Sequence, residues 1–197
     1  MNVLMVTPHL PPHQAANALL PHLLGGALTG QGHDVGYLTF GREADRADVT
    51  FIRRRLPRLR ATRLPQVLEA AETWGKGRAL VARADLVHVH SNTWMNQVAA
   101  RLAARRGRPY LLTHYGTEIW HHDGRDRRFR RLNREAAHVT FYSAALLERA
   151  RELELPMRAA SVVYPPVADA FQLPAAEARA AETVSYTHLT LPTILRV

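Results

Sequence analysis

The sequence predicts an α/β fold: a doubly wound, mostly parallel sheet with helices on both faces. Short β-branched or apolar runs alternate along the chain with Ala/Leu/Arg-rich stretches of helical spacing. Several of these runs, such as residues 3–6 and 86–89, are apolar nearly throughout, which is typical of strands covered on both faces. Strand–helix alternation with such runs indicates a parallel sheet with right-handed crossovers, so the predicted architecture is Rossmann-like.

Seven runs are expected as strands, and the stretches between most of them as helices. The first helix is expected within residues 14–30, because its apolar positions recur at three- and four-residue steps. Ala18, Leu19, Leu23, Leu24 and Leu28 form this apolar stripe. The predicted strands are residues 2–7, 34–40, 49–54, 85–90, 109–114, 138–143 and 160–164.

Composition limits the class of protein. The chain has 197 residues, of which 47% are hydrophobic and 22% charged, enough for one globular domain or one domain with an incomplete second. It has no cysteine, which excludes disulfides, thiolate metal sites and cysteine nucleophiles. The first residues lack the basic region of a signal peptide, and no run approaches the ~18 apolar residues of a membrane span. We therefore expect a cytoplasmic protein.

The net charge of +9 comes almost entirely from arginine, with 26 Lys+Arg against 17 Asp+Glu. Residues 53–63 mix arginines with leucines, a composition that suits an anionic lipid surface, so we expect peripheral contact there with the inner face of the membrane. A solvated basic face without a ligand is the alternative. Few aromatic residues and no recognisable module argue against nucleic acid. The two arginine clusters are Arg53, Arg54, Arg55, Arg58, Arg60 and Arg63, and Arg125, Arg127, Arg128, Arg130, Arg131 and Arg134.

Polar side chains follow the predicted strands at the edge where open parallel sheets bind their ligands. We assign His88 and His90 to opposite faces of their strand, with His88 in the core and His90 at the cleft. His114, at the end of the fifth strand, could hydrogen-bond a hydroxyl group and orient it; the alternative is a capped strand-end histidine bonded to backbone. For the loop histidines a solvated position is the alternative. The candidate substrate contacts at this edge are His9, Pro12, His13, His90, Asn92, Tyr115, Gly116, Glu118 and Ser143.

Three other chemistries lack their sequence patterns. Glu118 and the His-His-Asp run at residues 121–123 do not have the spacing of metal ligands, so we expect no metal. No Gly-x-Ser-x-Gly elbow occurs, which argues against a serine hydrolase. Residues 7–18 contain no glycine, so the dinucleotide-binding pattern is absent and we expect no cofactor.

Four segments, in order, resemble the amino-terminal domain of family-4-type retaining glycosyltransferases, which have the GT-B fold of two Rossmann-like domains. The first is a strand, a Pro-Pro loop and a long helix ending in Gly-His-Asp-Val at residues 32–35. The second and third are Asp-Leu-Val-His-Val-His at 85–90 and Leu-Thr-His-Tyr-Gly-Thr-Glu at 112–118. The fourth, Val-Val-Tyr-Pro-Pro-Val-Ala-Asp-Ala-Phe at 162–171, resembles the segment that joins the two domains.

The resemblance implies a hexosyltransferase-like enzyme that moves a sugar, with retention, from a nucleotide-sugar donor to a carbohydrate or lipid-linked acceptor. It implies that His114 is the catalytic residue, beside the transferring sugar, and that no metal or cofactor is needed. The family's first loop carries a Gly-Gly pair at the donor diphosphate. Here Ala15 and Ala16 stand at the corresponding positions, and their methyl groups reduce the clearance for a phosphate group.

The expected organisation is an acceptor-side Rossmann-like domain at residues 1–171, the start of a linker or second domain at 172–183, and a non-native tail at 184–197. The tail has no alanine and no acidic residue, unlike the residues before it, and resembles a translated sequencing adapter. In the enzymes that the chain resembles, the donor-binding residues lie in the second domain. We therefore expect the chain alone to be inactive; a stand-alone, non-catalytic ligand-binding module is the alternative.

Overall fold

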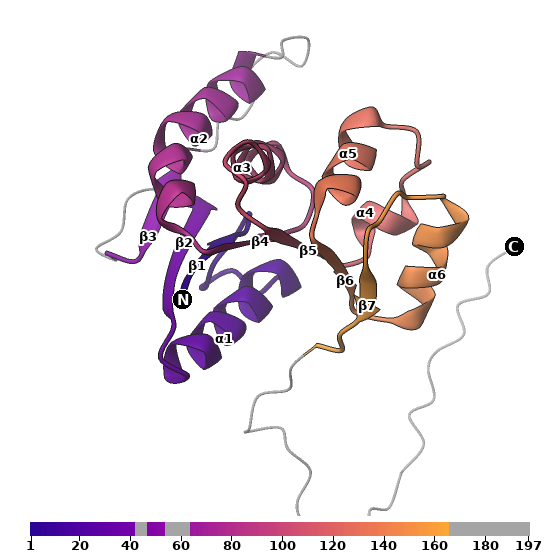
Figure 1. The fold of residues 1–197 in the computed structure, drawn as a ribbon, viewed down its shortest axis with the longest axis horizontal. Coiled ribbons are helices and arrows are strands. Elements are labelled where there is room, and N and C mark those ends of the chain that lie inside the picture. The colour runs from indigo at the N-terminus through magenta and orange to yellow at the C-terminus, as the bar shows by residue number, and fades with distance from the viewer. Residues whose placement is uncertain (42–46, 54–63, 166–197) are drawn as a thin grey trace, which may run out of the picture. The chain divides into compact units, whose positions relative to one another are not determined.

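The computed structural model describes residues 1–41, 47–53 and 64–165, and these residues form one all-parallel sheet (Figure 1). The strands lie in the order β3-β2-β1-β4-β5-β6-β7. The order reverses between β1 and β4, which is the switch point of a doubly wound fold. The predicted fold class is confirmed. The strands are β1 (Asn2–Val6), β2 (Asp34–Phe40), β3 (Val49–Ile52), β4 (Leu86–His90), β5 (Tyr110–His114), β6 (His138–Phe141) and β7 (Ala160–Val162).

Helices connect the strands and cover both faces of the sheet. In Figure 1, α1 lies against one face, and α2, α3 and α5 lie against the opposite face. Side-chain caps begin α3 and α6 at the carboxyl ends of β4 and β6: the hydroxyl groups of Thr93 and Ser143 accept backbone N–H groups of the first helical turn. The helices are α1 (Ala16–Gly30), α2 (Leu64–Arg83), α3 (Trp94–Arg105), α4 (Thr117–Trp120), α5 (Arg127–Glu135) and α6 (Ala144–Glu152).

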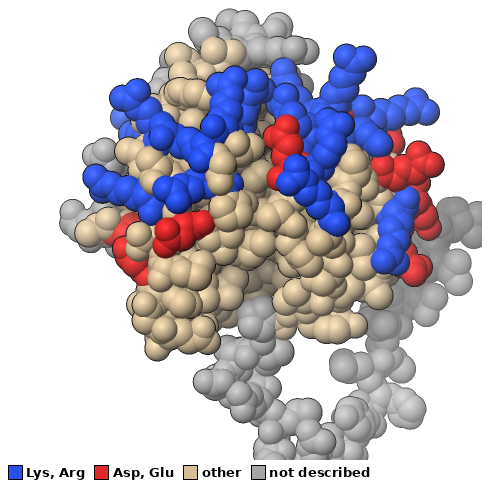
Figure 2. All heavy atoms as spheres, in the orientation of Figure 1, with Lys and Arg blue, Asp and Glu red and all other residues tan. Residues whose placement is uncertain are grey.

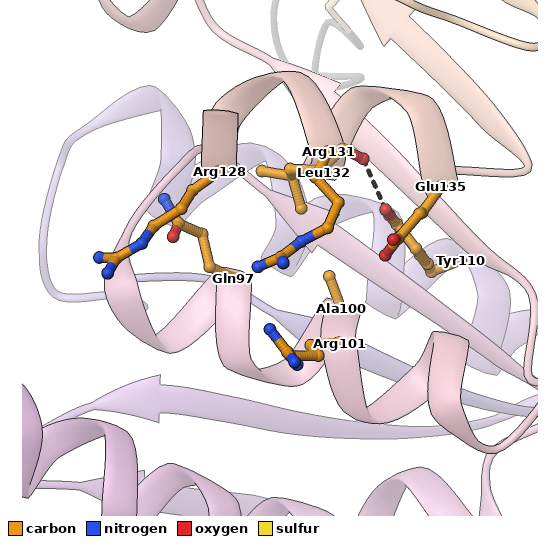
Figure 3. A pocket seen from close by; sticks show the side chains of 8 residues that line it. All are labelled: Gln97, Ala100, Arg101, Tyr110, Arg128, Arg131, Leu132 and Glu135. Atoms are coloured by element: carbon orange, nitrogen blue, oxygen red, sulfur yellow. Dashed lines mark hydrogen bonds between the residues drawn. The ribbon is translucent and has the colours of Figure 1, made fainter. Parts of the chain in front are cut away.

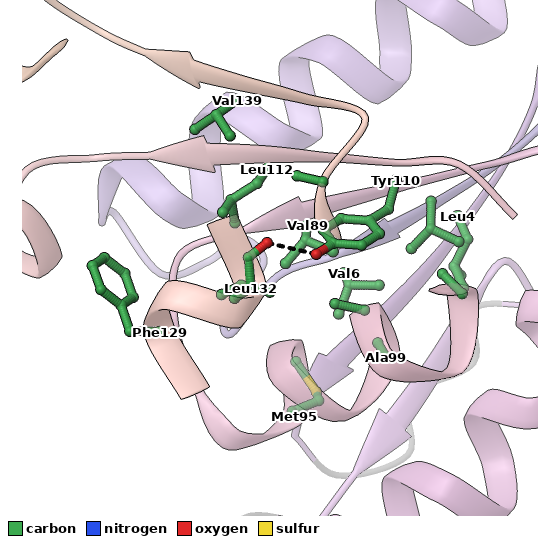
Figure 4. Packing of buried hydrophobic residues seen from close by; sticks show 14 of the residues in the cluster. Leu4, Val6, Val89, Met95, Ala99, Tyr110, Leu112, Phe129, Leu132 and Val139 are labelled. Atoms are coloured by element: carbon green, nitrogen blue, oxygen red, sulfur yellow. Dashed lines mark hydrogen bonds between the residues drawn. The ribbon is translucent and has the colours of Figure 1, made fainter. Parts of the chain in front are cut away.

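The hydrophobic core consists of two clusters, one on each face of the sheet, because successive side chains of a strand point to opposite faces. Leu4 and Val6 of β1 belong to the large cluster beneath α3 and α5 (Figure 4). Val3 and Met5 belong, with Leu24, to a smaller cluster beneath α1.

The apolar stripe expected on α1 is wider than the face that the helix buries. Ala18 is fully buried, and Leu24 and Leu28 pack partly against the sheet. Leu19 and Leu23, by contrast, are 39% and 41% exposed, so the sheet covers only part of the stripe. α1 contains no charged residue that would mark the edge of its buried face in the sequence.

Some expectations concern residues outside those described. They are the part of the first arginine cluster at residues 54–63, the joining segment from residue 166 onward, and the tail at 184–197. In the described part of the chain, no helix is long and apolar enough to cross a membrane. The same residues contain no group of three His, Cys, Asp or Glu side chains placed to hold a metal ion.

Candidate functional site

A partly buried aromatic cluster occupies the carboxyl edge of the sheet at β4, β5 and β6. The hydroxyl of Tyr115, directly after β5, shares a 2.9 Å hydrogen bond with Nδ1 of His90, the last residue of β4. The Tyr115 ring meets Tyr142, directly after β6, edge-on, with 4.9 Å between the ring centroids. Burial raises the pKa of both phenols, so both remain neutral hydroxyls. The cluster therefore presents neutral hydrogen-bonding groups, which suit a ligand that carries hydroxyls.

The two histidines of β4 lie on the same face, so the expectation of opposite faces is wrong. Side chains two residues apart on a strand share a face, and the rings of His88 and His90 lie with 4.0 Å between their centroids. Nε2 of His88 shares a 2.7 Å hydrogen bond with Oγ1 of Thr113, which shares another with Thr140. Burial lowers the pKa of His88 to about 4. Burial, and then repulsion from His88, lowers the pKa of His90, so both rings are neutral at neutral pH.

His114, the predicted catalytic residue, is fully enclosed beneath α5. Its Nε2 lies 2.8 Å from Oδ1 of Asn133, and because that oxygen can only accept, Nε2 carries the proton. The amide of Asn133 donates in turn to the carbonyl of Phe129. The histidine ring packs against Phe129 and Phe141, with centroid distances of 5.5 and 5.4 Å. These contacts belong to a strand-end residue that fixes α5, and a direct contact of His114 with substrate stays a prediction.

Glu118 connects His114 to the cluster at the edge. Its Oε1 accepts the backbone N–H of Tyr115 at 2.9 Å and lies 3.4 Å from Nδ1 of His114. That separation is long for a hydrogen bond, and Nδ1 has no other partner among the described residues. Burial alone would raise the pKa of Glu118, but its interactions with His114 and with the Tyr115 N–H hold it below its usual value. The carboxylate is therefore charged and fixes the backbone before Gly116, whose φ of 135° turns the chain into α4.

Asn96 of α3 holds the loop after β4. The sequence does not identify this residue, because it does not lie at the end of a strand. Its amide donates to the backbone oxygens of His90 and Ser91. Ser91 has a φ of 76°, so the chain turns sharply there. Asn92, a predicted substrate contact, is partly exposed, and its Oδ1 accepts a 2.8 Å hydrogen bond from Gln97. No sequence signal marks Asn96, because a polar residue in a first helical turn is usually solvated.

The loop between β1 and α1 is buried at Thr7 and Leu10 and open to solvent in its second half. The rings of His9 and His13 lie 4.7 Å apart, and Pro12, His13, Ala15 and Ala16 are exposed. Ala15 precedes the first helical residue with a φ of −73°, which alanine adopts freely, and no side chain caps the helix start. Uncapped N–H groups at a helix start are suited to anions. Contact of this loop with a donor phosphate stays a prediction.

The structure thus brings some predicted residues together and separates others. His90, Tyr115 and Glu118 are linked at the carboxyl edge, joined by Tyr142, which the sequence placed inside a strand. The hydroxyl of Ser143, a predicted substrate contact, accepts the N–H of Leu146 at 3.2 Å and caps α6. His114 lies on the other face of β5, beneath α5.

The fold and this edge define a class of protein, a Rossmann-like α/β domain with a polar ligand edge at the carboxyl ends of its strands. Residues 22–166 match the family described as the glycosyl transferase 4-like domain, and the chain belongs to that family. The resemblance found in the sequence is confirmed, and the sheet is that of an amino-terminal GT-B domain.

Solved structures with this fold come from several enzymes. Part of the sucrose-phosphate synthase of Thermosynechococcus elongatus has a TM-score of 0.60 at 14% identity, covering 85% of this chain and 91% of that chain. Acinetobacter baumannii MurG has a TM-score of 0.54 at 13% identity, covering 84% and 46%. UDP-GlcNAc 2-epimerase from Neisseria meningitidis, bound to UDP-GlcNAc, has a TM-score of 0.56 at 14% identity, covering 82% and 45%. This chain therefore spans less than half the length of the last two. The search of curated proteins found no match.

Proposed function

We propose that this chain provides the acceptor-side domain of a glycosyltransferase that moves a sugar from a nucleotide-activated donor to a carbohydrate or lipid-linked acceptor. Membership of the glycosyl transferase 4-like family supports the reaction class. A structural neighbour bound to UDP-GlcNAc supports a nucleotide sugar as donor. The observation that carries the placement of the acceptor is the neutral cluster of His90, Tyr115 and Tyr142 at the carboxyl edge.

In this proposal the edge acts by positioning an acceptor hydroxyl. Neutral His90 fixes the hydroxyl of Tyr115, and Glu118 fixes the Tyr115 backbone, so the phenol has a defined direction. An acceptor hydroxyl bonded to Tyr115 is thereby oriented for transfer, an effect that accelerates a reaction without a covalent intermediate on the protein. The family resemblance supports retention of configuration, and no metal or cofactor takes part in the proposal.

We assign His114 a positioning role. Asn133 holds its Nε2, and its Nδ1 lies 3.4 Å from Oε1 of Glu118, so the enclosed ring limits where the carboxylate that accepts the Tyr115 N–H can lie. A direct catalytic role would need the enclosed ring to be uncovered when substrate binds. The hydrogen bond with Asn133 opposes such a movement, because breaking it leaves two buried polar groups without partners. The packing of the ring against Phe129 and Phe141 would be lost as well.

The donor diphosphate is assigned to a second Rossmann-like domain, so the chain alone is proposed to be inactive. Backbone N–H groups near Ala15 and Ala16 are the contribution that the first loop offers to a phosphate. A cytoplasmic location and peripheral membrane contact through residues 53–63 complete the proposal. Of those residues only Arg53 is described, and it is exposed.

A glycan array tests acceptor binding, with Tyr115→Phe as the variant and Tyr164→Phe, at a position that is 72% exposed, as the control. Loss of one hydroxyl contact should weaken glycan binding about fivefold in Tyr115→Phe, with no change in the control. The absence of any bound glycan, or an equal loss in both variants, contradicts the proposed edge. Selective binding of a non-carbohydrate molecule at this edge favours the stand-alone binding module.

A turnover assay tests the proposed inactivity. Mass spectrometry should detect no consumption of UDP-GlcNAc or UDP-glucose by the purified full chain above a His114→Ala control. Turnover by the wild-type chain alone would show that it holds its own donor site.

A further inference from the structure

A concave feature lies between α3 and α5, apart from the aromatic cluster. Side chains of both helices line it, and Figure 3 shows Arg131 reaching from α5 toward Arg101 of α3. An adjoining open depression of about 270 Å³ shares Arg101, Arg131 and Glu135 with it and is also lined by Arg105. We call this feature the α3–α5 groove and define it by Gln97, Arg101, Arg105, Arg128, Arg131 and Glu135.

The groove carries four arginines against a single carboxylate, that of Glu135. Among the residues that the structure describes, none of these arginines forms an ion pair. The groove belongs to a wider surface over α2, α3 and α5 on which Lys and Arg side chains gather, as Figure 2 shows. Four guanidinium groups against one carboxylate leave an excess of positive charge in the groove, and an anion bound there reduces the repulsion among them.

Two tryptophans hold arginines at the sides of the groove. The guanidinium carbon of Arg105 lies 5.1 Å from the centroid of the Trp74 ring, and that of Arg128 lies 4.4 Å from the Trp94 ring. These cation–π contacts restrict side chains that would otherwise sample many rotamers. A ligand then loses less conformational entropy when it binds, which distinguishes the groove from an ordinary solvated basic surface.

From this arrangement we infer that the α3–α5 groove binds the phosphate groups of an anionic ligand, at a site separate from the carboxyl-edge cluster. Planar guanidinium groups match phosphate oxygens with paired hydrogen bonds. An anionic phospholipid headgroup and a soluble polyphosphate share this chemistry. The inference does not depend on the proposed acceptor edge, because neither Arg101 nor Arg131 belongs to that cluster.

The test uses the full chain and two probes. Calorimetry measures binding of inorganic pyrophosphate, and co-sedimentation measures binding to phosphatidylglycerol vesicles, with phosphatidylcholine vesicles as the uncharged reference. The groove variant is Arg101→Ala/Arg131→Ala. The control, Arg149→Ala/Arg151→Ala, removes the same charge from α6. Thermal melting checks folding, and Arg101→Gln, at an exposed position, replaces the groove variant if that variant does not fold.

We expect one or both probes to bind, with an affinity about tenfold weaker in the groove variant and unchanged in the control. Binding of pyrophosphate alone identifies a soluble phosphate ligand, and binding of phosphatidylglycerol vesicles alone identifies a lipid headgroup. For Arg101→Gln alone the expected loss is about threefold. Failure of both probes to bind the wild-type chain overturns the inference. An equal loss in the groove variant and the α6 control also overturns it, since binding would then follow net charge only.

Discussion

Gly25 shows how closely the first helix lies against the sheet. A Cβ atom at Gly25 would lie 1.8 Å from Oη and 2.8 Å from Cζ of Tyr37, a buried residue of β2. A Cβ atom at Gly26 would meet nothing within 4 Å. Both glycines lie in the interior of α1, so alanine brings the same gain in helix propensity at each. The pair of variants therefore separates packing from propensity.

The expected magnitudes follow from these contacts. Propensity alone favours alanine by about 1 kcal/mol, so Gly26→Ala should raise the free energy of unfolding by about that amount. At Gly25 the Tyr37 ring must move, and overpacking of this kind costs about 1–3 kcal/mol. The free energy of unfolding of Gly25→Ala should therefore lie ~1–3 kcal/mol below that of Gly26→Ala.

Urea unfolding followed by far-UV circular dichroism measures both values. Adding Tyr37→Phe to Gly25→Ala removes the nearest atom and should recover part of the loss, although Cζ remains close. An equal gain in stability in the two single alanine variants would refute the close packing of α1 on β2. The position of the first loop, which α1 anchors, would then also be in doubt.

Three further predictions concern the cap, the buried histidine and the buried tyrosine. Ser143→Ala removes the cap of α6 and should lower the free energy of unfolding, measured by urea unfolding, by about 1 kcal/mol. Ser143→Thr keeps the capping hydroxyl and should retain most of this stability. The pKa of His88 is 6.5 when unfolded and about 4 when folded, so its contribution to stability is complete above pH 6.5 and is lost as pH falls toward 4, by up to roughly 3 kcal/mol. His88→Gln should flatten the unfolding free energy against pH in this window; an unchanged slope would contradict the assignment. Tyr110→Phe loses a 2.5 Å hydrogen bond to the buried carbonyl of Leu132 and should cost about 1–3 kcal/mol, with Tyr164→Phe as the neutral surface control.

The sheet was predictable because its strands carry their own signals. β1 is apolar nearly throughout, and β4 carries leucine and valine beside its two histidines. The segments that follow these strands show the three- and four-residue spacing of apolar residues that is typical of helices. Which side of α1 packs on the sheet was not predictable, because the helix has no charged residue to mark its solvent-exposed side. Leu19 and Leu23 were therefore assigned to a stripe that the sheet only partly covers.

The sequence predicts that the candidate site lies at the carboxyl edge of the sheet, but not on which face of the sheet each side chain lies. Strand-end position places His90, Tyr115 and Glu118 at the carboxyl edge. The alternation of side chains along β5 does indicate that His114 is buried, because it lies on the same face as the core residues Tyr110 and Leu112. Tyr142 gains its role from a contact with Tyr115 on another strand, which no local pattern shows. Asn96 gains its role from the turn at Ser91, which brings the backbone oxygens of His90 and Ser91 back to its side chain.

The central claim is that an acceptor binds at the carboxyl edge of β4, β5 and β6. The most direct test is a titration of the ¹⁵N-labelled full chain with a glycan that the array retains, followed by amide chemical shifts. We expect the largest shifts at the N–H groups of Asn92, Tyr115 and Thr117, with none at Arg101 or Arg131. Saturable binding that leaves the three edge amides unchanged would contradict the claim.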